Sequence, residues 1–303
     1  MRVTNLIQQR NSVTGLQLNL AALERTRLDI ASGVRLRRMS DNPTDASQVV
    51  RVGSSMRALD QFRRNIKIGQ AKVESEERAL DNLTNTLGRA AELAISQASS
   101  TATPETRLSV KAEVDALIDF AVGLGNTRFG DEYIFSGTRG SERPFRNPPG
   151  PGGDFRNLLD ASSAPVNPSG GIPLEIGDGR FMTPNSNGTE AFLDTNALRA
   201  LYDLSQALGA DDVPGIQNSV DAIRNSVSSI QSLVGRQGAR MNELDIAEQQ
   251  IGDLELTLQT FRSDLRDTEI DKAMVELVGK QTLYQAAMSA TSRVLGLSLA
   301  NYL

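Results

Sequence analysis

The sequence feature that most constrains the fold is a helical repeat that continues without a break from Pro43 to about residue 98. Its apolar residues recur mainly three, four or seven positions apart: Val49, Val52, Met56, Leu59, Phe62, Ile66, Val73, Leu80, Leu83, Leu87, Ala90 and Ala94. This spacing places them on one stripe of a single helix, which at 1.5 Å per residue would be about 80 Å long. A stripe of that length needs a partner of similar length.

A second long repeat supplies such a partner. It follows Pro214 and continues to about residue 265, a helix of about 75 Å by the same measure. Shorter repeats predict four further helices: one at each end of the chain, one after Pro104 and one after Asn196. We therefore predict a mainly α fold, an elongated antiparallel coiled-coil or helical-bundle rod.

Residues 131–192, between the two long repeats, differ in composition. They hold most of the prolines and about half of the aromatic residues, and "DEYIFSG" and "PLEIGDGRFM" indicate short strands with turns. We predict a small β-rich inserted domain, and a partly disordered loop is the alternative for 146–170. The expected segments are 1–38 (N-terminal assembly helix), 39–130 (first part of the rod), 131–192 (insert), 193–266 (second part of the rod) and 267–303 (C-terminal assembly helix).

The helices at the two ends of the chain carry only narrow apolar seams. The seam residues are Leu16, Leu20, Leu23 and Ile30 near the N-terminus, and Met274, Leu277, Tyr284, Met288 and Leu295 near the C-terminus. An isolated helix of this kind is marginal in water, because nucleation is unfavourable and nothing covers its seam. We expect both terminal helices to be disordered in the monomer and to fold when they meet each other and neighbouring copies.

The distribution of charge agrees with such a pairing. Residues 1–64 carry an excess of six positive charges, and residues 241–303 carry an excess of five negative charges. Opposite charges at the two ends favour their side-by-side association. Solvated helix faces that differ in charge by chance are the alternative.

The stretch "SGVRLRRMSDNPTDAS" (32–47) separates the first short helix from the long one. Gly33 suits the end of a helix, because glycine tolerates the left-handed conformation. Asn42 precedes a proline and is therefore free to cap the next helix, and Pro43 fits the first turn of that helix. The stretch is thus predicted to be a hinge.

The arginines of this hinge, including Arg37 and Arg38, could also be read as a phosphate site. The chain is acidic overall, however, and it lacks nearby aromatic residues and any Gly-rich phosphate loop. We therefore expect no nucleic-acid partner. The arginines are expected to face neighbouring subunits.

The chain contains no cysteine and no histidine. This excludes thiolate nucleophiles, Cys/His zinc sites, Ser-His-Asp triads and histidine acid-base catalysis. Adjacent carboxylates such as Glu76-Glu77 and Asp211-Asp212 do not share a helix face and indicate solvated surface. No stretch of ~18 apolar residues could span a membrane, and "MRVTNLIQQRNSVTG" lacks the apolar core of a secretory signal. We expect a protein that is not an enzyme and has no cofactor, metal or membrane partner.

Four stretches of the sequence resemble the flagellin-like family. They are "LDIASGVRLRRMSDNPTDAS" (28–47), residues 64–94, "GNTRFGDEYIFSGT" (125–138) and "SDLRDTEIDKAMVELVGKQTLYQAAMSATSRVLGLSLANYL" (263–303). Asn42 stands where the family's Ser-Asp-Asp-Pro turn has its second Asp. The resemblance covers the chain except about residues 146–190.

This resemblance implies a structural protein that is exported unfolded through the flagellar type III apparatus and then acts outside the cell, in the bacterial flagellum. The implied partners are hook-associated protein 1, flagellin, other copies of this chain, and a cytosolic export chaperone that holds the C-terminal helix during a transient cytoplasmic stage. The Asn-Pro turn, "YIFSGT" and the short segment before the Ser-Gly turn favour an adaptor at the hook-filament junction. The alternatives are filament flagellin itself, or a secreted coiled-coil adhesin or effector with the insert as its ligand-binding head.

Overall fold

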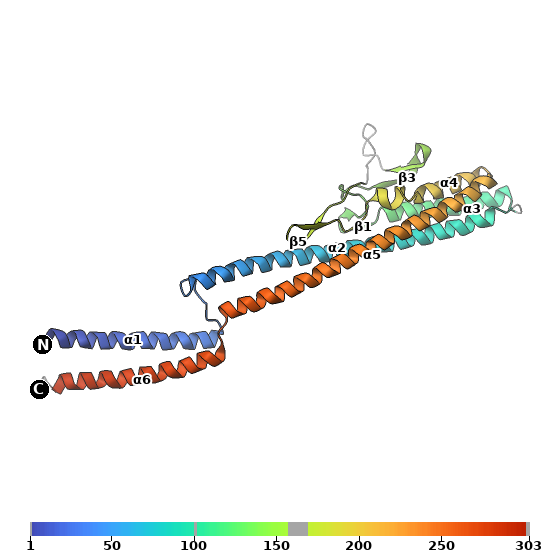
Figure 1. The fold of residues 1–303 in the computed structure, drawn as a ribbon. Helices are drawn as coiled ribbons and strands as arrows, with labels where there is room; N and C mark the ends of the chain where they lie inside the picture. The colour runs from blue at the N-terminus through green and yellow to red at the C-terminus, as the bar shows by residue number, and fades with distance from the viewer. Residues whose placement is uncertain (1, 100–101, 157–168, 301–303) are drawn as a thin grey trace. The chain divides into compact units, whose positions relative to one another are not determined.

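A computed structural model describes residues 2–99, 102–156 and 169–300 (Figure 1). Within these ranges the chain is mainly helical, with long antiparallel helix pairs and small β-sheets in the middle, which confirms the predicted fold class. Two compact units are formed, Met1–Ala58 with Leu254–Leu303, and Leu59–Asp253. The division passes through the two long helices, α2 (Pro43–Gln97) and α5 (Val213–Arg266), and not through the joints that delimit the expected segments.

The first unit contains the two terminal helices, α1 (Arg2–Ser32) and α6 (Ile270–Ala300). They lie side by side and antiparallel, so that the beginning of α1 and the end of α6 meet (Figure 1). Helix α1 ends where Gly33 adopts a positive φ of 67°, and α2 begins at Pro43, as predicted. The unit also includes the start of α2 and the end of α5.

The second unit is a helical bundle in which the remaining parts of α2 and α5 pack with α3 (Pro104–Gly125) and α4 (Ala197–Gly209). Helix α3 begins as predicted, because Thr103 caps it and Pro104 occupies its first turn. The core draws buried side chains from all four helices, among them Leu80, Leu83, Leu87, Val114, Ile118, Leu201, Leu204, Ile223 and Ile230. The second part of the stripe predicted on α2, from Leu80 to Ala94, therefore lies in this core.

The insert consists of three two-stranded antiparallel sheets within the described residues. They pair β1 (Arg128–Phe129) with β2 (Glu132–Tyr133), β3 (Phe145–Gly150) with β4 (Asp154–Arg156), and β5 (Leu174–Gly177) with β6 (Arg180–Met182). A short helix, Pro151–Gly153, lies between β3 and β4, and another, Thr189–Leu193, follows β6. Both predicted strand segments are confirmed. Of the candidate loop, 157–168 lies outside the described residues, and strands β3 and β4 occupy most of the rest.

A cluster of phenylalanines joins the insert to the helical bundle. The Phe192 ring meets Phe135 edge to face, with centroids 5.0 Å apart, and the tilted Phe145 ring at 5.2 Å. All three rings are fully buried and belong to the same core as the four helices. Because aromatic pairs of this kind add to the hydrophobic stabilisation, the insert is an integral part of the second unit.

Candidate assembly interface

Helices α1 and α6 meet along a seam in which apolar and small polar residues alternate. The side chains that point into this seam recur three or four positions apart. They are Ser12, Leu16, Asn19, Leu23, Thr26 and Ile30 from α1, and Ala273, Leu277, Lys280, Tyr284, Ala287 and Thr291 from α6. The Lys280 ammonium donates a hydrogen bond to the Thr26 hydroxyl at 2.8 Å. Of these twelve side chains only Leu23, Thr26 and Ala273 are fully buried, so the pair covers little apolar surface.

The structure places the candidate assembly residues in two groups. Leu16, Leu23, Ile30, Leu277 and Tyr284 lie on the seam. The others, Leu20, Met274 and Met288, lie beside it with 41%, 50% and 50% of their surface exposed, and the side chain of Leu295 is outside the described residues. The difference arises because Asn19, Thr26 and Lys280 occupy seam positions, and a search for apolar residues alone passes over them.

The two joints, 33–42 and 267–269, are hydrogen-bonded to each other. Val34 and Asp267 form an antiparallel bridge, in which the Arg35 N–H donates to the Arg266 carbonyl at 2.8 Å and the Thr268 N–H donates to the Gly33 carbonyl at 2.9 Å. The Thr268 hydroxyl also donates to the Asp29 carbonyl at 3.1 Å. The sequence offers no signal for this pairing, because only one residue on each side takes part.

The hinge residues also hold the start of α2. Asn42 Oδ1 accepts hydrogen bonds from the backbone N–H groups of Thr44 at 3.2 Å and Asp45 at 3.3 Å, which is the geometry of a helix cap. Pro43 follows as the first residue of the helix. Gly33, with its positive φ, has open space around it, so its conformation and not crowding favours glycine there.

The arginines around the first joint line a cavity of about 430 Å³, together with Leu28 and Asp41. Arg25 pairs with Asp41 at 2.8 Å, and Arg37 pairs with Asp29 at 2.7 Å. The Arg38 N–H also donates to the Asp41 carboxylate, and this hydrogen bond, with the charge of Arg25, lowers the pKa of Asp41. We call Arg25, Leu28, Arg37, Arg38 and Asp41 the arginine pocket.

Large apolar side chains are exposed on both terminal helices. At least two fifths of the surface of each is exposed: Ile7, Val13, Leu18, Leu20 and Leu28 on α1, and Ile270, Met274, Val275, Val278, Leu283 and Met288 on α6. Single exposed apolar residues are common on protein surfaces, but eleven of them on one pair of helices point to an interaction site. The pair of terminal helices is therefore the candidate interface of the chain.

A buried polar network joins α2, the insert and α5 in the second unit. Glu76 Oε2 accepts from the Ser186 N–H at 2.9 Å, and the Ser186 hydroxyl oxygen accepts from Gln237 at 2.9 Å and from Arg240 at 3.1 Å. Burial raises the pKa of Glu76 to about 7, although the hydrogen bonds from Ser186 oppose this shift. The expectation that Glu76 is solvated is wrong, because the chain near Ser186 covers it. Its neighbour Glu77 is exposed.

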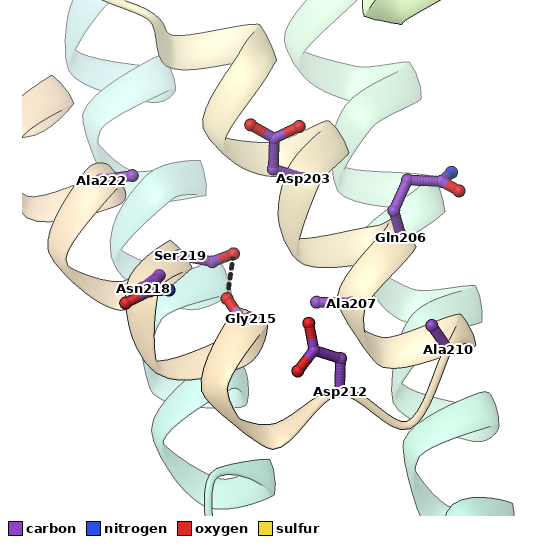
Figure 2. A pocket seen from close by; sticks show the side chains of 9 residues that line it. All are labelled: Asp203, Gln206, Ala207, Ala210, Asp212, Gly215, Asn218, Ser219 and Ala222. Carbon is purple, nitrogen blue, oxygen red and sulfur yellow. Dashed lines mark hydrogen bonds between the residues drawn. The ribbon is translucent and has the colours of Figure 1, made fainter.

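A second cavity, of about 420 Å³, lies between α4 and the start of α5 (Figure 2). Its lining includes the carboxylates of Asp203 and Asp212 and the side chains of Ala207, Ala210 and Ala222. Asp203 already accepts two hydrogen bonds from Arg199, and the Ser219 hydroxyl donates to the Gly215 carbonyl at 2.8 Å. The lining residues therefore provide no nucleophile with an adjacent base, and the cavity is a groove between two packed helices.

Two further classes of site are absent from the part of the chain that the structure describes. None of its helices combines the length and the apolar content that crossing a membrane requires. Nor do three or more Asp or Glu side chains gather there in a way that could hold a metal ion.

Two family models match the chain in succession. Residues 3–139 match the bacterial flagellin N-terminal helical region, and residues 217–303 match the bacterial flagellin C-terminal helical region. The first match includes nearly all of α1 and the whole of α2, α3, β1 and β2, and the second includes most of α5 and extends through α6. Both halves of the candidate interface thus lie within matched regions.

Individual relatives match over almost their whole length. Flagellar hook-associated protein 3 of Escherichia coli (strain K12) is 24% identical over 312 residues, which cover 99% of this chain and 98% of that protein. Flagellin of Bacillus subtilis (strain 168) is 22% identical, with 95% of this chain and 94% of that protein covered. The crystal structure of the flagellar junction protein FlgL from Legionella pneumophila superposes with a TM-score of 0.53 at 14% identity, over 73% of this chain and 100% of that one. At this identity the structural match concerns the fold alone.

Proposed function

Because the chain belongs to the bacterial flagellin family, whose members are structural proteins of the flagellum, we propose that it is the adaptor that joins hook to filament. The observation that carries this proposal is the end-to-end correspondence with hook-associated protein 3, which extends through the insert. The adaptor acts outside the cell. It lies between hook-associated protein 1 and the first flagellin subunits and contacts further copies of itself.

Assembly proceeds through the terminal helices. Their outward faces expose eleven large apolar side chains, whereas the seam between them buries few side chains. A pair with so little buried surface gains little free energy on its own, and neighbouring subunits supply the missing contacts. Folding of α1 and α6 is therefore coupled to assembly, and before export a chaperone holds α6 in a transient cytoplasmic pool.

Limited proteolysis of the dilute monomer tests this coupling. Residues 1–35 and 270–303 should be cut rapidly, while 43–265 resists because its core is complete without a partner. The same protease applied to isolated flagella should leave the termini intact. Protected termini in the dilute monomer would contradict coupled folding and would leave the adaptor role untouched.

A deletion strain tests the adaptor role itself. Without the junction, flagellin is still exported but has nothing to assemble on, so unpolymerised flagellin should accumulate in the medium of a non-motile culture. The flagellin relatives, which match over nearly the same length, favour filament flagellin as the second candidate. If the chain is flagellin, the deletion strain will release no flagellin at all, because its filament subunit is gone.

A further inference from the structure

Helix α1 carries a second seam on the side that faces away from α6. Leu18, Ala21, Arg25 and Leu28 follow one another at intervals of three, four and three, and all four are exposed. At 100° per residue, this outer seam lies on roughly the opposite side of α1 from the inner seam of Leu23. Its spacing is that of a helix face that packs against another helix.

Helix α6 has a corresponding outer seam. Asp271, Val275, Val278 and Thr282 follow at intervals of four, three and four, and all are exposed. They too lie roughly opposite the inner seam of their helix. The pair α1–α6 therefore presents one unpartnered seam on each of its two outer sides.

The charges of the two outer seams are complementary. The seam of α1 ends in the arginine pocket, where Arg25 and Arg37 are held by Asp41 and Asp29. Among the described residues, the Arg38 guanidinium forms no hydrogen bond or ion pair, although its charge helps to lower the pKa of Asp41. The Asp271 carboxylate, at the start of the α6 seam, likewise forms none there. The pocket at the end of the α1 seam thus has an arginine outside any ion pair, beside Leu28, and the α6 seam has a carboxylate outside any ion pair, beside Val275.

We propose that the outer seam of α1 in one copy docks antiparallel on the outer seam of α6 in the next copy, with Asp271 of that copy in the arginine pocket. The proposal rests on the proposed function, because it names the contact through which copies assemble. Burial of the apolar side chains supplies the attraction. The charge pair fixes register and orientation more than affinity.

The charge pair sets the register of the docked seams. With Asp271 of the next copy in the arginine pocket, at the level of Leu28, the antiparallel arrangement brings Val278 of that copy to Ala21, seven positions along each helix. Within one copy the two terminal helices are antiparallel in a similar register, since Lys280 donates to Thr26 and Thr268 donates to the Asp29 carbonyl.

A contact between two different surfaces of identical chains repeats without closing on a pair. Each copy offers α1 to one neighbour and α6 to the other, so the same contact generates an open or ring-shaped array. The complementary charge of the chain's two ends then has a specific cause. A second copy, and not an unrelated partner, is the occupant that this complementarity fits.

Disulfide cross-linking tests the contact directly, since the natural chain has no cysteine. A full-length chain with Ala21→Cys and Val278→Cys, expressed in the deletion strain, should give a reducible ladder of dimers and larger species in oxidised flagella. The matched control is Leu20→Cys with Val278→Cys, because Leu20 is the preceding residue but points away from the outer seam. A motile strain whose Ala21/Val278 chain remains monomeric, or cross-links no better than the control, would overturn the proposal.

A charge exchange provides a second, independent measurement. Asp271→Arg should abolish motility, and adding Arg38→Asp to the same chain should restore it, because the pair is then reversed. Failure of the double variant together with absence of the ladder overturns the contact, while flagellin in the medium of the deletion strain still supports the adaptor role. Conversely, a ladder combined with a deletion strain that releases no flagellin supports the contact and refutes the adaptor.

Discussion

The buried Glu76 carboxylate accepts a hydrogen bond from the Ser186 N–H at 2.9 Å and so joins α2 to the insert. Among the described residues its other oxygen, Oε1, has no hydrogen-bond partner, and neither has the buried Oε1 of Gln237 in α5, whose side chain lies within hydrogen-bonding range of the carboxyl. Both atoms are acceptors, and a proton on Glu76 supplies the donor that they lack. The protonated acid is therefore the form that this site accommodates best.

Stability of the second unit is expected to fall as the pH rises from about 4.5 to about 7. The pKa of Glu76 is about 7 when folded, against 4.5 for an ordinary glutamate, so the folded state binds more protons than the unfolded state in this interval. By linkage, ionisation costs about 3 kcal/mol of the free energy of unfolding by the upper end of the interval. Glu76→Gln should remove this slope, because the amide keeps an acceptor for Ser186 and supplies a permanent donor.

Urea unfolding at a series of pH values measures this effect with little background. The chain has no histidine and no cysteine, so few other groups titrate in this interval. The matched control is Glu77→Gln, which changes an exposed carboxylate at the neighbouring position and should keep the slope. Equal slopes in the natural chain and in Glu76→Gln would refute the assignment.

Replacement of Arg107 by Met is expected to destabilise the bundle more than the same replacement of an exposed arginine. The buried Arg107 side chain donates to the carbonyls of Gln97 and Ser99, each at 3.2 Å, and to the carboxylate of Asp211. Leaving these acceptors without a donor should lower the free energy of unfolding by about 2 kcal/mol. Chemical denaturation measures the change.

The control for this measurement is Arg89→Met. Arg89 also pairs with acids, Glu92 and Glu113, but in solvent, so its loss should cost no more than about 0.5 kcal/mol. Similar losses for Arg107→Met and Arg89→Met would show that the carbonyl contacts of Arg107 contribute little.

Asn42→Ala is expected to weaken the start of α2, since it removes the acceptor for the N–H groups of Thr44 and Asp45. The loss of a cap of this kind costs about 1 kcal/mol. Asn42→Asp should be neutral or stabilising, because it keeps the acceptor and adds a negative charge at the helix N-terminus. Hydrogen exchange at the first amides of α2 distinguishes the three chains, and equal protection in all of them would refute the cap.

Leu23→Ala is expected to weaken assembled flagella more than Leu20→Ala. Leu23 is 4% exposed on the inner seam, whereas Leu20 is 41% exposed beside it. Truncating a buried leucine costs about 2–5 kcal/mol, and the shallow seam argues for the lower end. The measurement is the temperature at which the chain leaves isolated flagella. Equal shifts would mean that Leu20 is buried by a neighbouring subunit.

The helices could be predicted well because their signals are local and repeated. The stripe through Leu80, Leu83 and Leu87, the Pro43 start and the Gly33 end each depend on residues close in sequence. The fold class followed from these signals. So did the inner seam in part, since five of the nine predicted assembly residues lie on it. What those signals share is that no distant partner is needed to interpret them.

The remaining features depend on contacts between distant residues. Asn19, Thr26 and Lys280 occupy seam positions because the opposite helix tolerates them there, which an apolar pattern cannot reveal. Glu76 is buried because Ser186 lies 110 positions away in sequence and folds over it. The hydrogen bond from Arg35 to Arg266 likewise joins two stretches that have no common pattern.

The bridge between Val34 and Asp267 couples the lengths of two distant parts of the chain. An insertion of one residue between Gly33 and Val34 would place the inserted residue in the position of Val34 and move the Arg35 N–H away from the Arg266 carbonyl. A compensating insertion near Asp267 would be needed to restore the hydrogen bonds. The two joints should therefore vary in length together, and α1 and α6 should change direction at those joints together and never one alone.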